Sequence, residues 1–291
     1  MKTTEKMQKI DSFKHVGLVI KPKGVSLDRH YLAIKSAIEK NGACLMVDEQ
    51  SARLLGCDGV PFERMCEQSD FLISLGGDGT LISLCRRSFS YNKPILGIHA
   101  GQLGFLTNIR TDEITTFIDK IFKEKYRIDK RIMLEVSLVS GNSKEVIFAF
   151  NDMVITRPKI SGMTTIDAYA FGNLFNSYYG DGLIVSTPTG STAYNLSAGG
   201  PIVYPLTKAL ILTPVCPHSL TQRPLVLPGD FELEFTSKEN NVVVIDGQDT
   251  YDMQDFDSIE VRVSPQSVKL IQELDGDYFD VLKEKLRWGS K

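Results

Sequence analysis

The feature that most constrains the fold of this chain is an alternation of short apolar runs with helical patterns between residues 15 and 107. The apolar runs 15–20, 70–75 and 94–98 indicate buried strands, and the segments 26–40 and 80–89 have helical periodicity. Strands that alternate with helices predict a parallel sheet with right-handed crossovers. We therefore expect a Rossmann-like α/β domain over residues 1–110.

After residue 130 the pattern changes to short strands separated by turn residues. Two segments are typical of hairpins: 132–150, which has a Gly-Asn turn, and 164–180. Further short strands are predicted at 231–235, 242–246, 258–264 and 267–271. We expect a mainly β second domain over 111–275, followed by a C-terminal tail, 276–291, that packs back on the first domain.

Residues 112–131 have a helical pattern that would join the two domains. Their Lys and Arg residues could bind phosphate, but Asp119, Glu124 and Asp129 are interleaved with them. This pattern favours a solvated helix face over a phosphate site.

The composition excludes several classes of function. The 291 residues are 42% hydrophobic and 24% charged, as in globular enzymes, and the net charge of −3 lacks the basic footprint of a general nucleic-acid binder. No apolar stretch approaches the roughly 18 residues that span a bilayer, and the first residues lack the apolar core of a signal peptide. We expect no nucleic-acid partner, no membrane association and a cytoplasmic location.

Neither the cysteines nor the acidic residues form a recognisable metal site. The five cysteines are odd in number and contain no CxxC pair, which predicts reduced, mostly buried thiols and no structural zinc. The acidic stretch 246–260 lacks the ligand spacing of a calcium loop. We interpret it as an exposed loop and strand edge.

The sequence GGDGT at 76–80 lies where the buried strand 70–75 ends and a helix begins. A glycine turn that leads into a helix presents backbone amides and the positive end of the helix dipole, which together attract phosphate. The loop lacks the Lys-Ser/Thr of a Walker motif and the GxGxxG spacing of a dinucleotide turn. The loop therefore fits neither common phosphate motif, and two interpretations stay open on these residues alone. It is a phosphate site of another kind, at the edge of the sheet where ligands bind, or a tight strand-to-helix turn in which Asp78 caps the helix.

Two other stretches carry candidate binding residues. Residues 181–201, DGLIVSTPTGSTAYNLSAGGP, are dense in small hydroxyl residues and glycines, which admit a ligand close to the backbone, and Tyr194 could stack on a flat ring. Asn151 and Asp152 are placed where a strand ends; an amide beside a carboxylate suits a purine edge or ribose hydroxyls, although Asn-Asp is also common in turns.

Together these stretches resemble the NAD kinases, which phosphorylate the 2′-hydroxyl of the adenosine ribose of NAD to make NADP. The resemblance runs from about residue 15 to the C-terminus. Its motifs are GGDGT at 76–80, GIHAGQLGFL at 97–106, Asn151-Asp152, the stretch 181–201, PHSLTQRPL at 217–225 and DGQ at 246–248. GGDG alone is shared with diacylglycerol kinases, whereas the run from TPTGSTAY to AGGP is far more specific.

The resemblance implies an NAD kinase-like fold and a set of roles. Asp78 would accept the proton of the 2′-hydroxyl as that oxygen attacks the γ-phosphorus of ATP. The glycine loop, namely Gly76, Gly77, Gly79 and Thr80, would admit phosphate or ribose. NAD would be bound by Asp78, Gly79, Asn151, Asp152, Asp181, Thr192, Ala193, Tyr194, Asn195, Ser197, Cys216 and Gln248.

The resemblance also implies substrates and partners. NAD and ATP would be the small-molecule substrates, with a divalent metal, Mg²⁺, assisting the triphosphate; no residue of this sequence is assigned as its ligand. Family members assemble as homodimers or homotetramers, and the same is expected here.

The sequence departs from the family pattern at several positions. His99 replaces an Asn, Asp152 replaces a Glu that is one methylene longer, and Gly162 and Tyr179 stand near positions that are often basic. These departures bear on affinity and regulation.

Two alternatives stay open at this point. One is a lipid or sphingoid-base kinase that shares the GGDGT loop; it should show an apolar or basic membrane-facing surface and lack TPTGSTAY. The other is a catalytically silent NAD(P)-binding regulator, against which the intact Asp78 and its glycines argue.

Overall fold

The computed structural model describes residues 9–10, 12–21, 27–100, 104–107, 109–158 and 162–289. The chain forms two compact units, the first made of residues 1–130 and 268–291 and the second of residues 131–267. The strands β5 (Arg127–Ser140) and β16 (Ser258–Gln272) continue from one unit into the other. The boundary expected at residue 110 thus falls inside the first unit, to which the C-terminal tail also belongs.

The first unit is built on the parallel sheet that the sequence predicts. Its strands lie in the order β2-β1-β3-β4-β16, and every pair is parallel. The bounds are β1 (His15–Ile20), β2 (Cys44–Val47), β3 (Phe71–Gly76) and β4 (Pro94–His99). All six residues of β3 are buried, as expected for the apolar run that forms the centre of a parallel sheet.

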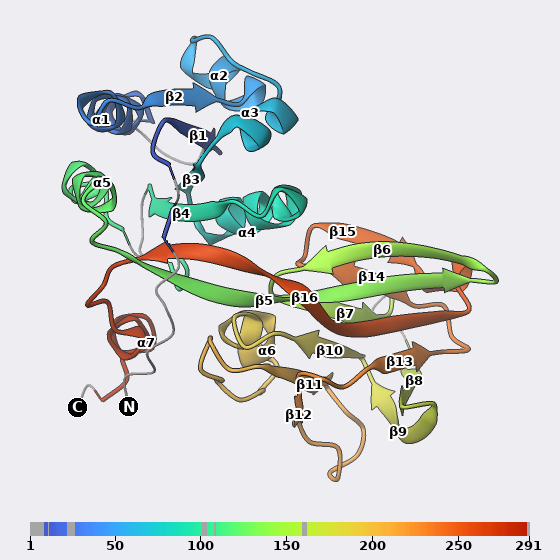
Figure 1. Cartoon of the computed structure of the whole chain (residues 1–291). Coiled ribbons are helices and arrows are strands. Elements are labelled where there is room, and N and C mark those ends of the chain that lie inside the picture. Colours follow the sequence, from blue (N-terminus) through green and yellow to red (C-terminus); the bar gives the residue numbers. More distant parts are fainter. Residues whose placement is uncertain are drawn as a thin grey trace. The chain divides into compact units, whose positions relative to one another are not determined.

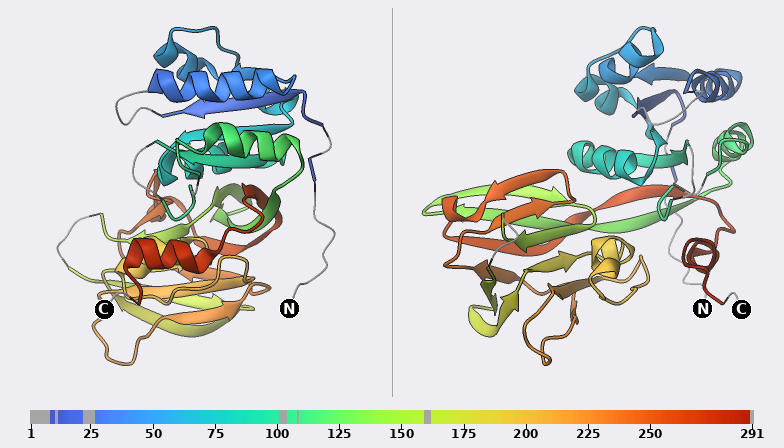
Figure 2. Two further views of the ribbon diagram at one scale, coloured as in Figure 1. Left: turned by 90° about the vertical axis from the view of Figure 1, so that its left-hand side faces the viewer. Right: turned by 180° about the vertical axis from the view of Figure 1, so that it is seen from behind.

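Helices cover both faces of this sheet (Figures 1 and 2). On one face lie α1 (Leu27–Lys40) and α5 (Ile114–Phe122), and on the other α2 (Glu49–Leu55), α3 (Phe62–Gln68) and α4 (Asp78–Arg87). A short 3-10 turn, Phe89–Tyr91, follows α4, and α7 (Tyr278–Leu286) is the C-terminal helix. Among the described residues, no helix is long and apolar enough to cross a membrane.

The core of the first unit lies between the sheet and these helices. Five apolar side chains of this core are 1% exposed or less: Ile34 and Ile38 of α1, Phe117 and Ile121 of α5, and Ile73 of β3. Their burial explains why the apolar residues of α1 and α5 recur at helical spacing. The fold prediction for this half of the chain is confirmed.

The prediction of a long helix over 112–131 is wrong for the second half of that segment. The helix α5 ends at Phe122, Glu124 adopts a left-handed conformation with φ of 55°, and β5 begins at Arg127. Asp129 is 6% exposed within that strand rather than on a solvated helix face. The chain turns here because Tyr126, which is 2% exposed, enters the core and accepts a hydrogen bond from the Ile10 amide at 2.7 Å.

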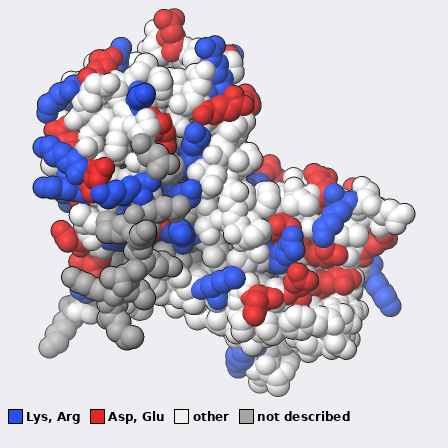
Figure 3. Space-filling view, in the orientation of Figure 1, with Lys and Arg blue, Asp and Glu red and all other residues white. Residues whose placement is uncertain are grey.

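The charged surface over α1 and α5 is a mixture of both signs (Figure 3). Asp119 of α5 accepts hydrogen bonds from Asn41, which follows α1, and from Lys40 at its end. These bonds hold the pKa of Asp119 below its usual value. The one lysine of α5, Lys120, pairs with Glu273 at 3.0 Å, so this helix has a solvated face with paired charges, as the interleaved acids indicate.

The prediction of mostly buried cysteines is wrong. Cys66 and Cys85 are buried, Cys57 is half-buried, and Cys44 and Cys216 are exposed. All five are free thiols. Burial raises the pKa of the Cys66 thiol to about 12, so this cysteine is an inert core residue.

The second unit is a sandwich of two sheets. One sheet has the order β6-β5-β16-β13-β8-β9 and the other β12-β11-β10-β7-β14-β15. The first sheet adds β6 (Ser143–Ala149), β8 (Thr164–Ala170), β9 (Asn173–Gly180) and β13 (Leu233–Thr236). The second consists of β7 (Asp152–Thr156), β10 (Gly182–Ser186), β11 (Ala209–Val215), β12 (Leu225–Pro228), β14 (Val242–Ile245) and β15 (Asp249–Asp252).

Both predicted hairpins are confirmed, as β5–β6 and β8–β9. The strands expected separately at 258–264 and 267–271 are one continuous strand, β16. The acidic stretch after residue 246 forms the exposed edge strand β15, a 3-10 turn (Met253–Asp255) and the start of β16.

Strand alternation decides which residues of the second unit face outward. Met153 and Ile155 of β7 and Val243 and Ile245 of β14 enter the core between the sheets. Because successive side chains of a strand point to opposite faces, Asp152, Val154, Thr156 and Val244 lie on the outer face. The outer face of the second sheet is therefore available to form a binding surface.

Replacement of Gly17 tests the packing of the first unit. An added Cβ at this position of β1 would lie 2.6 Å from Leu72 Cδ2 and 2.8 Å from Ser69 Oγ. We expect Gly17→Ala to lower the free energy of unfolding by about 1–3 kcal/mol because the side chains of Leu72, Ser69 and Met65 must shift to admit the methyl group. Gly276→Ala is the control, since its Cβ would meet no atom closer than 3.5 Å. Equal urea midpoints for the two variants would contradict the prediction.

Candidate functional site

The GGDGT loop forms the junction between β3 and α4. Gly76 ends the strand and Asp78 is the first residue of the helix, with Gly77 between them. The carboxylate of Asp78 does not cap its own helix. It accepts backbone N–H bonds from Phe105 (2.8 Å, on Oδ2) and from Leu106 and Thr107 (3.3 and 3.1 Å, on Oδ1), and the Thr107 hydroxyl donates to Oδ1 at 3.0 Å.

Glycine at position 104 makes this arrangement possible. A Cβ there would lie 1.9 Å from Asp78 Oδ1 and 2.6 Å from the Thr107 hydroxyl oxygen. Residues 104–106 end the GIHAGQLGFL motif, of which residues 101–103 lie outside the described residues, and Thr107 follows directly after it. The end of this motif and the next residue therefore supply the amides that orient the Asp78 carboxylate.

The glycines of the loop differ in their surroundings. A Cβ at Gly76 would meet the Thr80 hydroxyl at 2.4 Å, so this glycine permits a close turn onto Thr80, which is 7% exposed. At Gly77 and Gly79 an added Cβ would meet no atom of the described residues within 4 Å, apart from the adjacent backbone. Neither has a positive φ, so open space is the feature that these two glycines provide.

His99 lies beside this loop. It is the last residue of β4, is 5% exposed and stands opposite Gly76 in the strand register. Its backbone N–H donates to the Ile109 carbonyl at 3.2 Å, and the next amide, that of Ala100, donates to the Gly76 carbonyl at 3.1 Å. The residue that replaces the family's Asn is thus a buried neighbour of the glycine loop.

The second unit contains a pocket of about 380 Å³ on the outer face of its second sheet, a volume typical of small-molecule sites. Its walls come from the strands β7 and β14, the turn after β14 and the start of the short helix α6 (Tyr194–Ser197). The lining residues are Asn151, Asp152, Val154, Thr156, Ala193, Tyr194, Val244, Asp246 and Gly247. Four residues that the sequence assigns to NAD binding therefore meet here: Asn151, Asp152, Ala193 and Tyr194.

Asp246 shapes one side of this pocket. Its carboxylate accepts three consecutive backbone N–H bonds, from Phe150 at 2.8 Å, Asn151 at 2.7 Å and Asp152 at 3.0 Å. Asp246 itself has a left-handed backbone with φ of 49°, and its N–H donates back to the Asp152 carbonyl at 3.0 Å. The DGQ motif thus fixes the position of the Asn151-Asp152 pair.

The electrostatics of the pocket are set by two carboxylates. Asp152 is 5% exposed, and this burial raises its pKa to about 7, with a further contribution from the negative charge of Asp246. Asn151 is 9% exposed, and its side-chain oxygen has no hydrogen-bond partner among the described residues. The pocket therefore offers a ligand one free acceptor and one carboxyl group that changes charge near neutral pH.

Most small hydroxyl residues of the stretch 181–201 are internal. The Thr187 hydroxyl donates to the Phe150 carbonyl at 2.8 Å and the Ser191 hydroxyl to the Pro188 carbonyl at 2.7 Å. Asn195 is fully buried and bonds Ser191, Pro201 and Thr213. A Cβ at Gly190 would lie 2.2 Å from the Asn151 carbonyl oxygen. These residues hold the backbone behind the pocket, and Ala193 and Tyr194 form its wall.

Asp181 lies outside the pocket lining and is held by Arg157. The Arg157 guanidinium donates to Asp181 Oδ1 at 2.5 Å and also to the Gly162 carbonyl. The hydroxyl of Thr156, the residue before Arg157 in the chain, donates to the Asp181 carbonyl at 3.0 Å. The Asp181 side chain remains 43% exposed. Gly162, which stands near a position that is often basic in the family, is therefore contacted by an arginine from elsewhere in the same unit.

The remaining predicted residues do not line the pocket. Thr192 is half-buried, and Ser197, Cys216 and Gln248 are exposed, as is Tyr179, whose ring lies edge-on to His218 at 6.1 Å. Sequence reasoning missed the role of Asp246, Gly247, Thr156 and the two valines of the wall. The DGQ motif contained the signal for Asp246, because an Asp-Gly pair after a strand is a turn that can offer its carboxylate to nearby amides.

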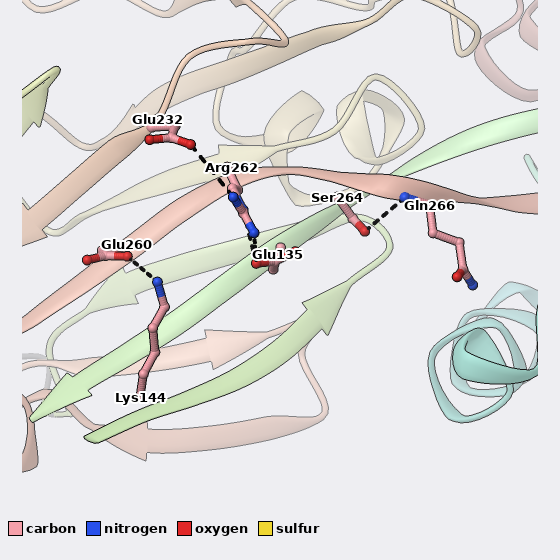
Figure 4. A network of polar contacts seen from close by, with 7 residues as sticks. All are labelled: Glu135, Lys144, Glu232, Glu260, Arg262, Ser264 and Gln266. Atoms are coloured by element: carbon pink, nitrogen blue, oxygen red, sulfur yellow. Dashed lines mark hydrogen bonds and ion pairs between the residues drawn. The ribbon is translucent and has the colours of Figure 1, made fainter. Parts of the chain in front are cut away.

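A second hollow of about 230 Å³ lies on the outer face of the other sheet of this unit. Glu135, which is 9% exposed, accepts bonds from Arg262 at 2.7 and 3.0 Å, and Lys144 donates to Glu260 at 2.6 Å (Figure 4). Arg262 also lies 3.7 Å from Glu232. These basic side chains are paired within the hollow, so it is a structural charge network of the sheet.

No group of three His, Cys, Asp or Glu side chains that could hold a metal ion occurs among the described residues. Mg²⁺ keeps several waters and is commonly bound by one or two carboxylates together with substrate phosphates. The described residues thus place at most two such donors together, the number that commonly binds Mg²⁺ alongside substrate phosphates.

Family models match both parts of the chain. The model of the ATP-NAD kinase N-terminal domain matches residues 60–126, and that of the ATP-NAD kinase C-terminal domain matches residues 150–273. The NAD kinase of Sulfurimonas denitrificans is 46% identical over 278 residues, which cover 95% of this chain and 98% of the relative. The NAD kinase of Wolinella succinogenes is 48% identical over 286 residues, which cover 98% and 99%.

Two solved structures share this fold. Yeast NADH kinase complexed with NADH matches with a TM-score of 0.84 and 26% identity, over 96% of this chain and 89% of the yeast chain. An NAD kinase from Archaeoglobus fulgidus in complex with ATP matches with a TM-score of 0.75 and 25% identity, over 94% and 98%. These likenesses confirm the predicted fold. The 46% and 48% identity of the two curated relatives over nearly the whole chain argues against the lipid-kinase alternative.

The raised pKa of Asp152 predicts a pH-dependent stability. Because the folded protein holds this proton more tightly than the unfolded chain, the stabilisation is present below about pH 4 and is lost as pH rises through 7. Asp152→Asn should therefore be more stable than the native protein at pH 8, by at most about 4 kcal/mol, and the difference should shrink towards pH 4. Urea unfolding of both proteins at several pH values, with carbon-13 titration of the carboxyl group, tests this. A difference that does not change with pH would contradict it.

Proposed function

This chain belongs to the NAD kinase family, and we propose that it transfers the γ-phosphoryl group of ATP to the 2′-hydroxyl of the adenosine ribose of NAD, which yields NADP. The observation that carries the proposal is the Asp78 carboxylate, fixed by three amides at an open glycine turn. Phosphoryl transfer needs positioning and charge stabilisation more than covalent chemistry, and such a turn supplies both.

Asp78 is proposed as the proton acceptor, and its hydrogen bonds indicate which oxygen acts. Among the described residues, Oδ1 accepts three hydrogen bonds and Oδ2 accepts one, from Phe105. A carboxylate oxygen has two lone pairs in its plane, so Oδ2 retains capacity for one more donor. We assign Oδ2 as the atom that receives the hydroxyl proton.

The glycine loop is proposed to bind phosphate or ribose. The space beside Gly77 and Gly79 lies at the N-terminus of α4, where N–H groups and the helix dipole favour negative charge. The side chain of Thr80 lies so close to Gly76 that only a glycine leaves room for its hydroxyl. A divalent metal bound to the triphosphate would neutralise the phosphate charge.

The pocket of the second unit is proposed to bind the adenylate part of NAD. Asn151 would accept a hydrogen bond from the adenine amino group or a ribose hydroxyl, which gives its unpaired side-chain oxygen a partner. Asp152 and Ala193 would contact the same group, and Tyr194, which is 46% exposed, offers a ring for stacking. Asp181, oriented by Arg157, would bond a ribose.

The other residues of the predicted set receive different proposals. Asn195 is given a positioning role, because its amide is occupied by three protein partners. Thr192, Ser197, Cys216 and Gln248 are proposed as further contacts for the rest of the dinucleotide. The cytoplasmic location and the assembly into homodimers or homotetramers stay predictions.

The first experiment measures NADP formation from NAD and Mg-ATP by the native protein and by Asp78→Asn. We expect the variant to lose at least about two orders of magnitude in kcat, because a positioned base contributes about 10²–10⁴-fold. NAD binding, measured by calorimetry, should be retained. Thr107→Val is the matched control: it removes one bond to the carboxylate but keeps the acid, so its loss should be much smaller.

Two results would contradict this assignment. A native protein that binds NAD but forms no NADP would favour the silent NAD(P)-binding regulator. An Asp78→Asn variant that is no slower than Thr107→Val would show that the loop geometry, and not the carboxylate, matters.

A second experiment tests the open space of the loop. Gly79→Ala adds a methyl group that would meet no atom of the described residues within 4 Å beyond the adjacent backbone, inside a helix that alanine favours. The unfolding free energy should be unchanged or higher, while kcat/KM for ATP falls by about tenfold or more because the methyl group occupies ligand space. Unchanged kinetics would show that no substrate approaches this glycine.

A further inference from the structure

The C-terminal helix α7 is part of the first unit and is anchored there at its start. Asp277 caps it by accepting the Phe279 N–H at 2.9 Å, and Leu282, at 1% exposure, is its buried contact. The rest of the helix is largely exposed. Burial of one leucine is a small apolar anchor for a nine-residue helix, so other contacts must fix its position.

The carbonyl groups of the turn before α7 are bound by the guanidinium of Arg127. Arg127 Nη1 donates to the carbonyl oxygens of Glu273, Gly276 and Leu274, at 2.5, 2.9 and 3.3 Å. Asp129 accepts from Arg127 Nε at 2.9 Å and so fixes the guanidinium, which is a planar group suited to several acceptors. The start of α7 therefore has a defined position relative to β5.

Near its C-terminal end, α7 contacts the segment that holds Asp78. Lys285 Nζ lies 5.7 Å from the centre of the Phe105 ring, within the range of a cation–π interaction. The backbone N–H of Phe105 is the donor to Asp78 Oδ2, at 2.8 Å. Phe105 thus makes two contacts: its ring meets Lys285, and its backbone amide orients Asp78 Oδ2, the oxygen assigned as proton acceptor.

We propose that α7 is a positioning element of the reaction, in which Lys285 holds the Phe105 ring and thereby keeps the Phe105 amide directed at Asp78 Oδ2. The inference rests on the proposed function of Asp78 and assigns a role to the C-terminal helix. Lys285 is a positioning residue in this proposal, because it acts through Phe105. The hydrogen bonds of Arg127 support this role because they fix the turn that leads into the helix of Lys285.

The test compares Lys285→Met with Lys283→Met. Both substitutions remove a positive charge from the same exposed helix. Lys283 is the control because it pairs with Asp280 within α7, whereas Lys285 is the cation at the Phe105 ring. We expect Lys285→Met to lower kcat about two- to fivefold, the value of one cation–π contact, with KM for NAD and ATP unchanged. Lys283→Met should leave kcat and KM as in the native protein. Equal kcat values for the two variants would overturn the proposal.

A double-mutant cycle and amide exchange separate positioning from a general effect on the helix. Phe105→Leu keeps the backbone amide and removes the ring, so Lys285→Met should cause no further loss of kcat in that background. Exchange of the Phe105 amide, which the Asp78 bond protects, should rise about two- to fivefold in Lys285→Met while amides of α7 stay as in the native protein. Additive losses of kcat, or an unchanged Phe105 exchange rate, would overturn the proposal.

The exchange experiment does not depend on catalysis. A native protein that makes no NADP would refute the proposed function, and the Phe105 amide would still report whether Lys285 holds the loop. Faster exchange at Phe105 together with an unchanged kcat would overturn the positioning role while leaving the proposed function intact.

Discussion

In each unit of this protein, one aspartate carboxylate accepts three consecutive backbone N–H groups from a segment far away in the sequence. Asp78 receives those of residues 105–107, and Asp246 receives those of residues 150–152. Buried amides need partners, and a carboxylate forms the stronger, charge-assisted type of bond with them. The two candidate regions of the molecule, the glycine turn and the pocket, take their shape from these two aspartates, each of which is followed by a glycine.

The sequence predicts well what depends on local periodicity. The apolar runs at 15–20, 70–75 and 94–98 are strands because a buried parallel strand needs an unbroken apolar stretch, and the hairpins follow from turn residues between alternating strands. The helix over 112–131 fails for a tertiary reason. Tyr126 enters the core, so the chain becomes extended although Lys and Glu residues there favour a helix.

The candidate site was predictable in its members but not in its contacts. The motifs locate Asp78, Asn151 and Asp152, yet nothing in one sequence shows that Asp246 binds amides nearly a hundred residues away. The hydroxyl-rich stretch 181–201 indicates close backbone approach, which the structure has at Gly190 against Asn151. Burial decides whether such a hydroxyl faces a ligand or a protein carbonyl, and burial is a property of the whole fold.

The departure at Asp152 has a physical consequence for the pocket. Its side chain is one methylene shorter than Glu, so the carboxyl group stays close to the backbone, 5% exposed and near the Asp246 charge. Burial disfavours the charged form of Asp152, and the negative charge of Asp246 adds to this effect, so the pKa of Asp152 is raised to about 7. The dinucleotide proposed for this pocket would carry negative phosphates, which a second negative charge in the pocket would repel. The neutral form of Asp152, which can also donate a hydrogen bond, is therefore the form better matched to such a ligand.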